Sequence, residues 1–141
     1  MDADQGSQKP SILRQGHLKS YNQRLLDVEM AYYKVCDQID ALKTSGSHVA
    51  PAGCWVVRYL AKGKTGDCWY YKLQAKQPLF KNRNGKPCRY QHLGKAGSDD
   101  YLEAIASVGR RAHLEALEYQ KKLLEQGLND LASESQSEPL L

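Results

Sequence analysis

The spacing of apolar residues changes twice along this chain, and that change constrains the fold more than any other feature. Over residues 16–45 the apolar residues alternate at intervals of three and four, which is typical of coiled-coil helices. Over residues 50–97 the interval falls to two, which is typical of β-strands. After residue 98 the first spacing returns. The pattern predicts an α+β protein with a β-sheet inserted between two long helices.

The two helical segments each carry an apolar stripe that can form a helix–helix seam. We expect helix one to span residues 16–46, where Thr44-Ser45-Gly46-Ser47 is a stop signal. Helix two is expected over residues 98–132, where Ser98 can cap the first amide groups. The seam residues are Leu18, Tyr21, Leu25, Val28, Tyr32, Val35, Ile39 and Leu42, followed by Leu102, Ile105, Gly109, Ala112, Ala116, Tyr119 and Leu123.

These stripes predict that the helices pair as a coiled-coil stalk. One solution is an antiparallel hairpin within a single chain, and the other adds a second chain to form a four-helix bundle. We expect a homodimer, because a single hairpin leaves much of both stripes in contact with water. The polar segments 1–15 and 133–141 are expected to be disordered tails.

Three strand-like runs occupy the middle of the chain, over residues 54–62, 69–75 and 88–93. Two turn signals separate them: residues 63–67, which contain two glycines, and residues 82–86, which contain an Asn-Gly step. Runs of this length joined by short turns predict a three-stranded antiparallel β-meander.

Positive charge is concentrated in this middle segment. Residues 50–97 hold ten Lys and Arg residues and one acid, Asp67, which gives a net charge of +9, whereas the whole chain carries +4. The remaining residues therefore carry −5. A basic segment flanked by acidic helices points to a polyanionic partner for the sheet, and a second partner could dock on the acidic helices.

Strict alternation along the strands would divide the sheet into an apolar and a basic face. The apolar face would carry Trp55, Val57, Tyr59, Trp69, Tyr71, Leu73 and Tyr90. The candidate DNA-binding residues are Arg58, Lys62, Lys64, Tyr70, Lys72, Lys81, Arg83, Lys86, Arg89 and Gln91. Arg and Gln side chains read base edges in the major groove, and cations in the turns neutralise phosphates. We therefore expect double-stranded DNA as the partner, with single-stranded nucleic acid as the alternative because Tyr70 could stack a base beside Lys72.

The order of short motifs in this segment resembles a known type of DNA-binding domain. Trp69-Tyr70-Tyr71 is followed by Asn84-Gly85-Lys86, by Tyr90-Gln91-His92-Leu93-Gly94-Lys95 and by a capped helix. Over residues 54–115 this is similar to the three-stranded-sheet domains at the front of phage and transposon tyrosine recombinases. It also resembles small proteins of plasmids and mobile elements. The resemblance implies that Arg58, Lys72, Arg89 and Gln91 enter a major groove. It implies no recombination, because the chain has no catalytic domain.

Enzymatic and metal-binding functions find little support in the sequence. Cys54, Cys68, Cys88 and His92 are zinc-binding residue types, but they lack the close pairs of a structural zinc site. We expect free thiols and no metal or cofactor. None of the histidines lies in a motif for nucleophilic catalysis, and no glycine-rich phosphate loop is present, so no enzyme is predicted.

The remaining alternatives concern location and partners. The chain has no long apolar segment and its first residues do not resemble a signal peptide, so we expect an intracellular, cytoplasmic protein, associated with the nucleoid if it binds DNA. Membrane-surface binding usually uses a basic amphipathic helix, whereas the basic segment here is strand-like. The main rival to DNA binding is a protein–protein adaptor that works through its coiled-coil helices.

Overall fold

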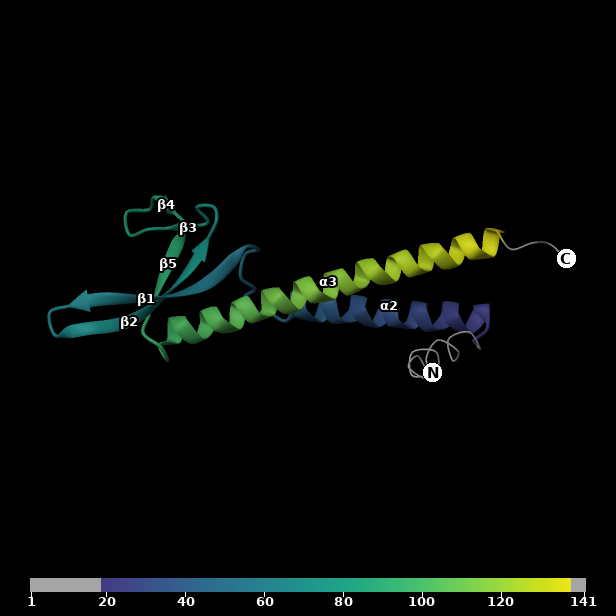
Figure 1. Ribbon diagram of the computed structural model, residues 1–141, viewed down its shortest axis with the longest axis horizontal. Coiled ribbons are helices and arrows are strands. Elements are labelled where there is room, and N and C mark those ends of the chain that lie inside the picture. Colours follow the sequence, from purple (N-terminus) through teal and green to yellow (C-terminus); the bar gives the residue numbers. More distant parts are fainter. Residues whose placement is uncertain (1–18, 138–141) are drawn as a thin grey trace, which may run out of the picture. The chain divides into compact units, whose positions relative to one another are not determined.

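The computed structural model describes residues 19–137 and contains two long helices, with a small antiparallel sheet formed by the segment between them in the sequence (Figure 1). The elements are α2 (Tyr21–Thr44), β1 (Cys54–Gly63), β2 (Gly66–Ala75), β3 (Phe80–Lys81), β4 (Pro87–Cys88), β5 (Tyr90–Gly94) and α3 (Asp99–Ser137). Strands β1, β2 and β5 form the three-stranded sheet in that order. The α+β class and the inserted three-stranded sheet are therefore confirmed.

The chain divides into two compact units. The sheet unit is Asp40–Ala116 and holds all five strands. The helical unit comprises, within the described residues, 19–39 and 117–137. Helix α3 continues to Ser137, beyond the predicted end at residue 132. Leu18 and the predicted N-terminal tail lie outside the described residues.

In the helical unit, α2 and α3 run antiparallel. The Tyr21 hydroxyl donates a hydrogen bond of 2.8 Å to the Leu131 carbonyl, and the Tyr32 hydroxyl donates one of 3.3 Å to Glu125. Arg24 forms an ion pair with Glu134, which lowers the pKa of that carboxyl. Along α2 the predicted stripe is the least exposed side: Val35 and Ile39 are buried, and Tyr21, Leu25, Val28 and Tyr32 are half-buried.

Along α3 the buried stripe differs from the predicted one. The buried residues are Ala104, Ser107 and Leu114 in the sheet unit, and Leu117 and Leu131 in the helical unit. The predicted seam residues Leu102, Ile105, Tyr119 and Leu123 are instead 55%, 45%, 63% and 46% exposed. Polar residues interrupt the buried stripe. Ser107 bonds back to the Ala104 carbonyl, and Arg111 donates a 2.7 Å hydrogen bond to the Ala50 carbonyl. The sequence pattern thus favoured a stripe that is more uniformly apolar than the buried one but lies on another side of the helix.

The core of the sheet unit forms where one face of the sheet packs on the first turns of α3. Leu73, Leu93 and Ala104 are buried at its centre. Around them lie Cys54, Val56, Tyr71, Phe80, Tyr101 and Val108, all partly buried. Burial raises the pKa of the Cys54 thiol, in keeping with its place as a small apolar residue in this core. All four cysteines lie within the described residues, and none forms a disulfide.

The register of the β1–β2 hairpin overturns the predicted division into faces. Gly63 pairs with Gly66, so the turn contains two residues and not the five predicted. Val57 then lies opposite Lys72, and Tyr59 opposite Tyr70. A register change of one residue moves every side chain of a strand to the other face. Trp55, Val57, Tyr59 and Tyr90 therefore share a face with Lys72, while Tyr71 and Leu73 pack into the core.

The predicted third strand is divided in two. Pro87–Cys88 forms the short strand β4 and pairs with β3, whereas Tyr90–Gly94 forms β5 and pairs with β2. The Asn-Gly turn therefore closes a small β3–β4 ribbon and does not join β2 directly to β5. Among residues 19–137, no helix is apolar over a length that would cross a membrane.

Candidate nucleic-acid interface

The sheet face that points away from the core, here called the open face, is rich in aromatic side chains around one central cation. Its residues are Trp55, Val57, Tyr59, Tyr70, Lys72, Gln74, Tyr90 and His92. Lys72 lies in the middle strand, paired with Val57 on one side and His92 on the other. Among the described strand residues on this face there is no acid, because Asp67 pairs with Lys62 on the opposite face.

Lys72 is held between two tyrosine rings. Its Nζ lies 5.3 Å from the centre of the Tyr59 ring and 4.9 Å from that of Tyr90. The Tyr59 hydroxyl is 3.0 Å from His92 Nδ1, and the Tyr90 and His92 rings meet edge to face at 5.2 Å. Cation–π and aromatic contacts of this kind fix the rings relative to one another. Tyr90 and His92 are exposed, and Tyr59 and Lys72 are half-buried, so the open face offers positioned aromatic rings beside a cation.

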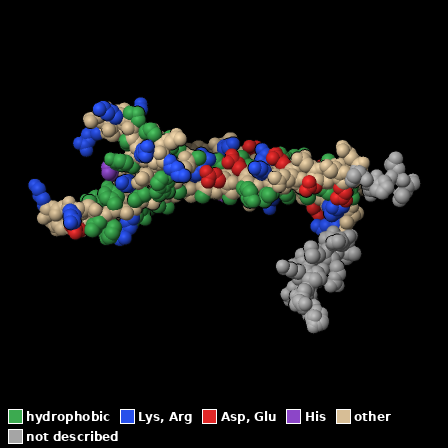
Figure 2. Space-filling model, turned by 45° about the horizontal axis from the view of Figure 1, so that its top comes forward, with side chains coloured by type: hydrophobic (Ala, Val, Ile, Leu, Met, Phe, Trp, Pro, Cys, Tyr) green, Lys and Arg blue, Asp and Glu red, His purple; other side chains and the backbone are tan. Residues whose placement is uncertain are grey.

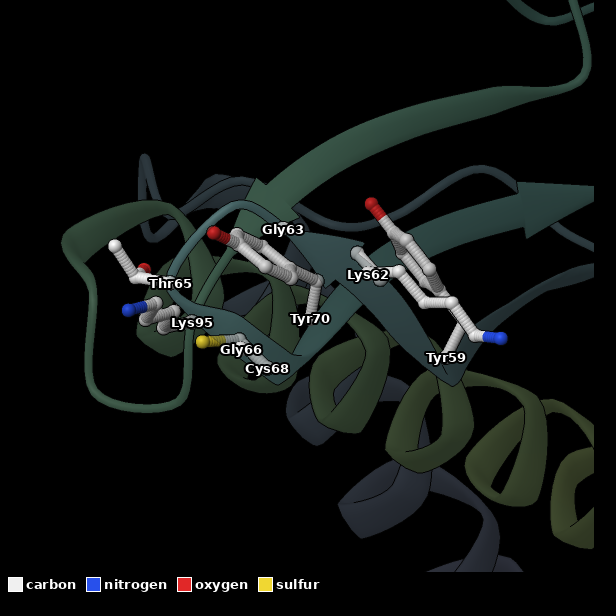
Figure 3. A pocket seen from close by; sticks show the side chains of 9 residues that line it. Tyr59, Lys62, Gly63, Thr65, Gly66, Cys68, Tyr70 and Lys95 are labelled. Carbon is white, nitrogen blue, oxygen red and sulfur yellow. The ribbon is translucent and has the colours of Figure 1, made fainter.

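A pocket of about 250 Å³ lies toward the turn of the β1–β2 hairpin (Figure 3). The rings of Tyr59 and Tyr70 stand side by side there, with centres 6.1 Å apart and planes inclined by 28°. The Nζ of Lys95 lies 5.8 Å from the centre of the Tyr70 ring. The remaining lining residues are Ala61, Lys62, Gly63, Thr65, Gly66 and Cys68. The pocket thus combines two ring faces, small residues and flexible cations.

The turn of the β3–β4 ribbon presents cations on a backbone with a fixed shape. The Asn82 side chain accepts hydrogen bonds of 2.9 Å from the backbone amides of Asn84 and Lys86. Gly85 has a φ of 79°, which L side chains rarely adopt, and its amide donates to the Asn82 carbonyl at 2.9 Å. Lys81, Arg83 and Lys86 are exposed in this turn. Figure 2 shows Lys and Arg side chains gathered at the ends of the sheet-unit loops.

The structure does not assemble the predicted groove-reading residues on one face. Tyr70 and Lys72 lie on the open face, and Lys64 lies in the exposed β1–β2 turn. Arg58 lies on the opposite face, where its guanidinium stacks 3.6 Å from the Trp69 ring centre. Gln91 also lies on that face, paired with Leu73, while Arg89 is exposed between β4 and β5. The proposed set of Arg58, Lys72, Arg89 and Gln91 is therefore wrong as a single reading surface.

The sequence prediction omitted Tyr59, Tyr90, His92 and Lys95 from the binding residues. Tyr59 and Tyr90 were expected in the core. The register of the β1–β2 hairpin places Tyr59 on the open face, and the pairing of β2 with β5, which is irregular between Tyr71 and Lys72, places Tyr90 there opposite Gln74. The signal that could have placed Tyr59 is the short Gly63-Lys64-Thr65-Gly66 segment, since two-residue loops are among the commonest hairpin connections. Gly66 has a φ of 127° in this turn.

Comparisons with known proteins add no family to this description. No protein-family model matches the chain, and no curated protein or solved structure matches it. Over residues 19–137, no three His, Cys, Asp or Glu side chains are grouped so that they could hold a metal ion. The open face and the basic turns are therefore the features that indicate a function.

Proposed function

We propose that this protein binds nucleic acid through the open face of its sheet. The observation that carries the proposal is the combination, on one face of the sheet, of positioned aromatic rings with Lys72 and with no acid among the described strand residues of that face. A sheet face that only contacts solvent usually carries charges of both signs and has few aromatic residues. Aromatic rings contact bases, and cations attract the phosphate backbone.

The basic turns extend this surface at two ends of the sheet unit. Lys64 occupies the β1–β2 turn, Arg83 and Lys86 occupy the β3–β4 turn, and Lys81 is the last residue of β3 beside that turn. We assign phosphate contacts to these four exposed side chains, because exposed cations at loop tips neutralise phosphates without reading sequence. The net charge of +9 on residues 50–97 provides the long-range attraction that brings a polyanion to the sheet.

A binding titration of the full chain tests the proposal. Labelled duplex DNA and a labelled single strand are titrated at several salt concentrations between about 50 and 200 mM, and the anisotropy is measured. We expect the binding constant of at least one of them to fall steeply with salt, as it does when cations displace counterions from phosphates. If affinity for both stays weaker than about 100 μM at physiological salt, below ordinary non-specific binding, the proposal is wrong and the adaptor interpretation takes its place.

The exposed stripe of α3 favours a second proposal, that the chain forms a homodimer. Large apolar residues, Leu102 and Ile105, precede three small ones, and Tyr119 and Leu123 follow them. The small residues are Gly109, Ala112 and Ala116, all exposed. This order, large–small–large, reads the same in both directions. A second copy of α3 running antiparallel can therefore match it, with close approach at the small residues.

Sedimentation equilibrium tests the dimer. We expect the wild-type chain to dimerise at tens of micromolar, and Ile105→Glu to be monomeric, because a buried charge on an apolar seam is strongly unfavourable. Leu79→Glu changes an exposed leucine outside α3 and provides the matched control. A wild-type chain that stays monomeric at these concentrations would refute the dimer.

A further inference from the structure

We infer that the pocket between Tyr59, Tyr70 and Lys95 receives an unpaired nucleobase, so that the preferred ligand is single-stranded nucleic acid. The inference rests on the proposed nucleic-acid binding and adds the class of ligand to it. It differs from the expectation of duplex DNA, which depended on Arg58 and Gln91 lying beside Lys72. The hairpin register places both of those residues on the other face.

The side chains of the open face are better suited to stacking on unpaired bases than to reading the edges of paired bases. Reading a duplex in the major groove requires side chains with fixed donors and acceptors, such as Arg, Asn or Gln. On the open face Gln74 is the only amide side chain among the described strand residues, and no Arg is present. The aromatic residues, by contrast, have ring faces on which an unpaired base can stack, whereas a paired base in a duplex is covered above and below by its neighbours.

The pocket has the size and lining for one base. Its volume is about 250 Å³, and its turn end is formed by Gly63 and Gly66, which have no side chains to fill it. Tyr59 and Tyr70 supply ring faces inclined by only 28°, so a planar ligand can lie along either ring. The Nζ of Lys95 lies beside the Tyr70 ring. A base on that ring would thus bring its phosphate within reach of this ammonium group.

The strand can continue along the open face from this pocket. Lys72 lies between Tyr59 and Tyr90, and Trp55 lies on the same face with 39% of its surface exposed. Alternating rings and cations match the way sequence-tolerant single-strand binders hold successive nucleotides. Trp69 is 46% exposed but lies on the opposite face, against Arg58. The two tryptophans therefore report on different faces of the same sheet.

The first experiment compares ligands and Tyr70 variants in the full chain. The probes are a labelled thymidine oligonucleotide of about 15 nucleotides and a duplex of the same length. We expect the single strand to bind more tightly than the duplex. Tyr70→Ala should weaken single-strand binding roughly 5- to 150-fold, the range found for loss of one stacked base, while Tyr70→Phe keeps most of the affinity. The salt dependence should not change, since no charge is removed. Tyr33→Ala, an exposed tyrosine of α2, is the control.

The second experiment locates the bound strand by tryptophan fluorescence. In Trp69→Phe the remaining Trp55 reports on the open face, and in Trp55→Phe the remaining Trp69 reports on the opposite face. We expect the unlabelled thymidine oligonucleotide to quench the tryptophan fluorescence of Trp69→Phe and to leave that of Trp55→Phe nearly unchanged. Because the two variants each lose one tryptophan, they are matched. Replacing the DNA strand with a uridine oligonucleotide distinguishes DNA from RNA, and binding of either supports the inference.

The outcomes separate this inference from the proposed function. A duplex that binds while the single strand does not compete overturns the unpaired-base inference and leaves nucleic-acid binding standing. The inference is also overturned if the oligonucleotide quenches the fluorescence of Trp55→Phe alone. It is likewise overturned if Tyr70→Ala and Tyr33→Ala lose the same affinity for the single strand. If neither duplex nor single strand binds, both proposals are wrong.

Discussion

Replacing Leu73 with alanine is expected to lower the free energy of unfolding by about 2–5 kcal/mol, because the substitution leaves a cavity in a core that can close only in part. Leu73 is 5% exposed and lies in the central strand of the sheet. It packs with Leu93 from β5 and Ala104 from α3, so its side chain holds strand and helix together. Urea denaturation followed by circular dichroism measures the loss.

Leu79→Ala is the matched control for this substitution, since Leu79 is 47% exposed and lies outside the core. Its effect should stay within about 0.5 kcal/mol, as for most surface substitutions. Equal losses for the two variants would show that Leu73 is not at the centre of the core. The cost of the core substitution is a large part of the stability of a domain, which is typically about 5–15 kcal/mol, so the refolded fraction should also be measured.

Neutralising the β3–β4 turn is expected to have the largest effect on ligand binding. The triple variant Lys81→Ala, Arg83→Ala and Lys86→Ala removes the three phosphate contacts proposed for this turn. The slope of log K against log salt should therefore become shallower by about 2 to 3, depending on whether the ligand is single- or double-stranded. Affinity at low salt should fall steeply, while the difference between variants should shrink at high salt because salt screens the charges. Titrations at several salt concentrations measure both quantities.

A triple variant in the helices separates local contacts from net charge. Lys34→Ala, Lys121→Ala and Lys122→Ala remove the same total charge from α2 and α3. If contact with phosphates occurs at the β3–β4 turn, this variant should keep most of the salt slope. Equal changes in the two triple variants would contradict the assignment, because they would show that only the overall charge of the protein matters.

The sequence allowed the elements of the fold to be predicted where local signals were strong. Ser98 was expected to cap the second helix, and its Oγ does accept a hydrogen bond of 3.1 Å from the Tyr101 amide. The two glycines of the first turn marked a hairpin, and the change of apolar period marked the limits of the sheet. These signals depend on neighbouring residues alone, so they can be read without knowing the tertiary structure.

The faces of the sheet could not be predicted with the same success, because they depend on register. Each strand of the hairpin has apolar or aromatic residues on both sides, such as Trp55 beside Val56 and Tyr70 beside Tyr71. Alternation alone then fits two registers, and only the length of the turn distinguishes them. The same ambiguity applies to α3, where Leu117 and Tyr119 lie on different stripes and packing selects Leu117 for burial. The candidate site followed the register, so its residues changed when the register changed.

The local bonding of Asn82 has a consequence for how a polyanion would be captured. Crowding Lys81, Arg83 and Lys86 into one short turn is electrostatically unfavourable, and a flexible loop would spread them apart. Here the amide side chain and the left-handed glycine hold the backbone in one shape before any ligand arrives. In the proposed binding mode, phosphates would relieve the repulsion between these like charges. Such preorganisation reduces the ordering entropy lost on association, and so favours tight capture by a very small surface.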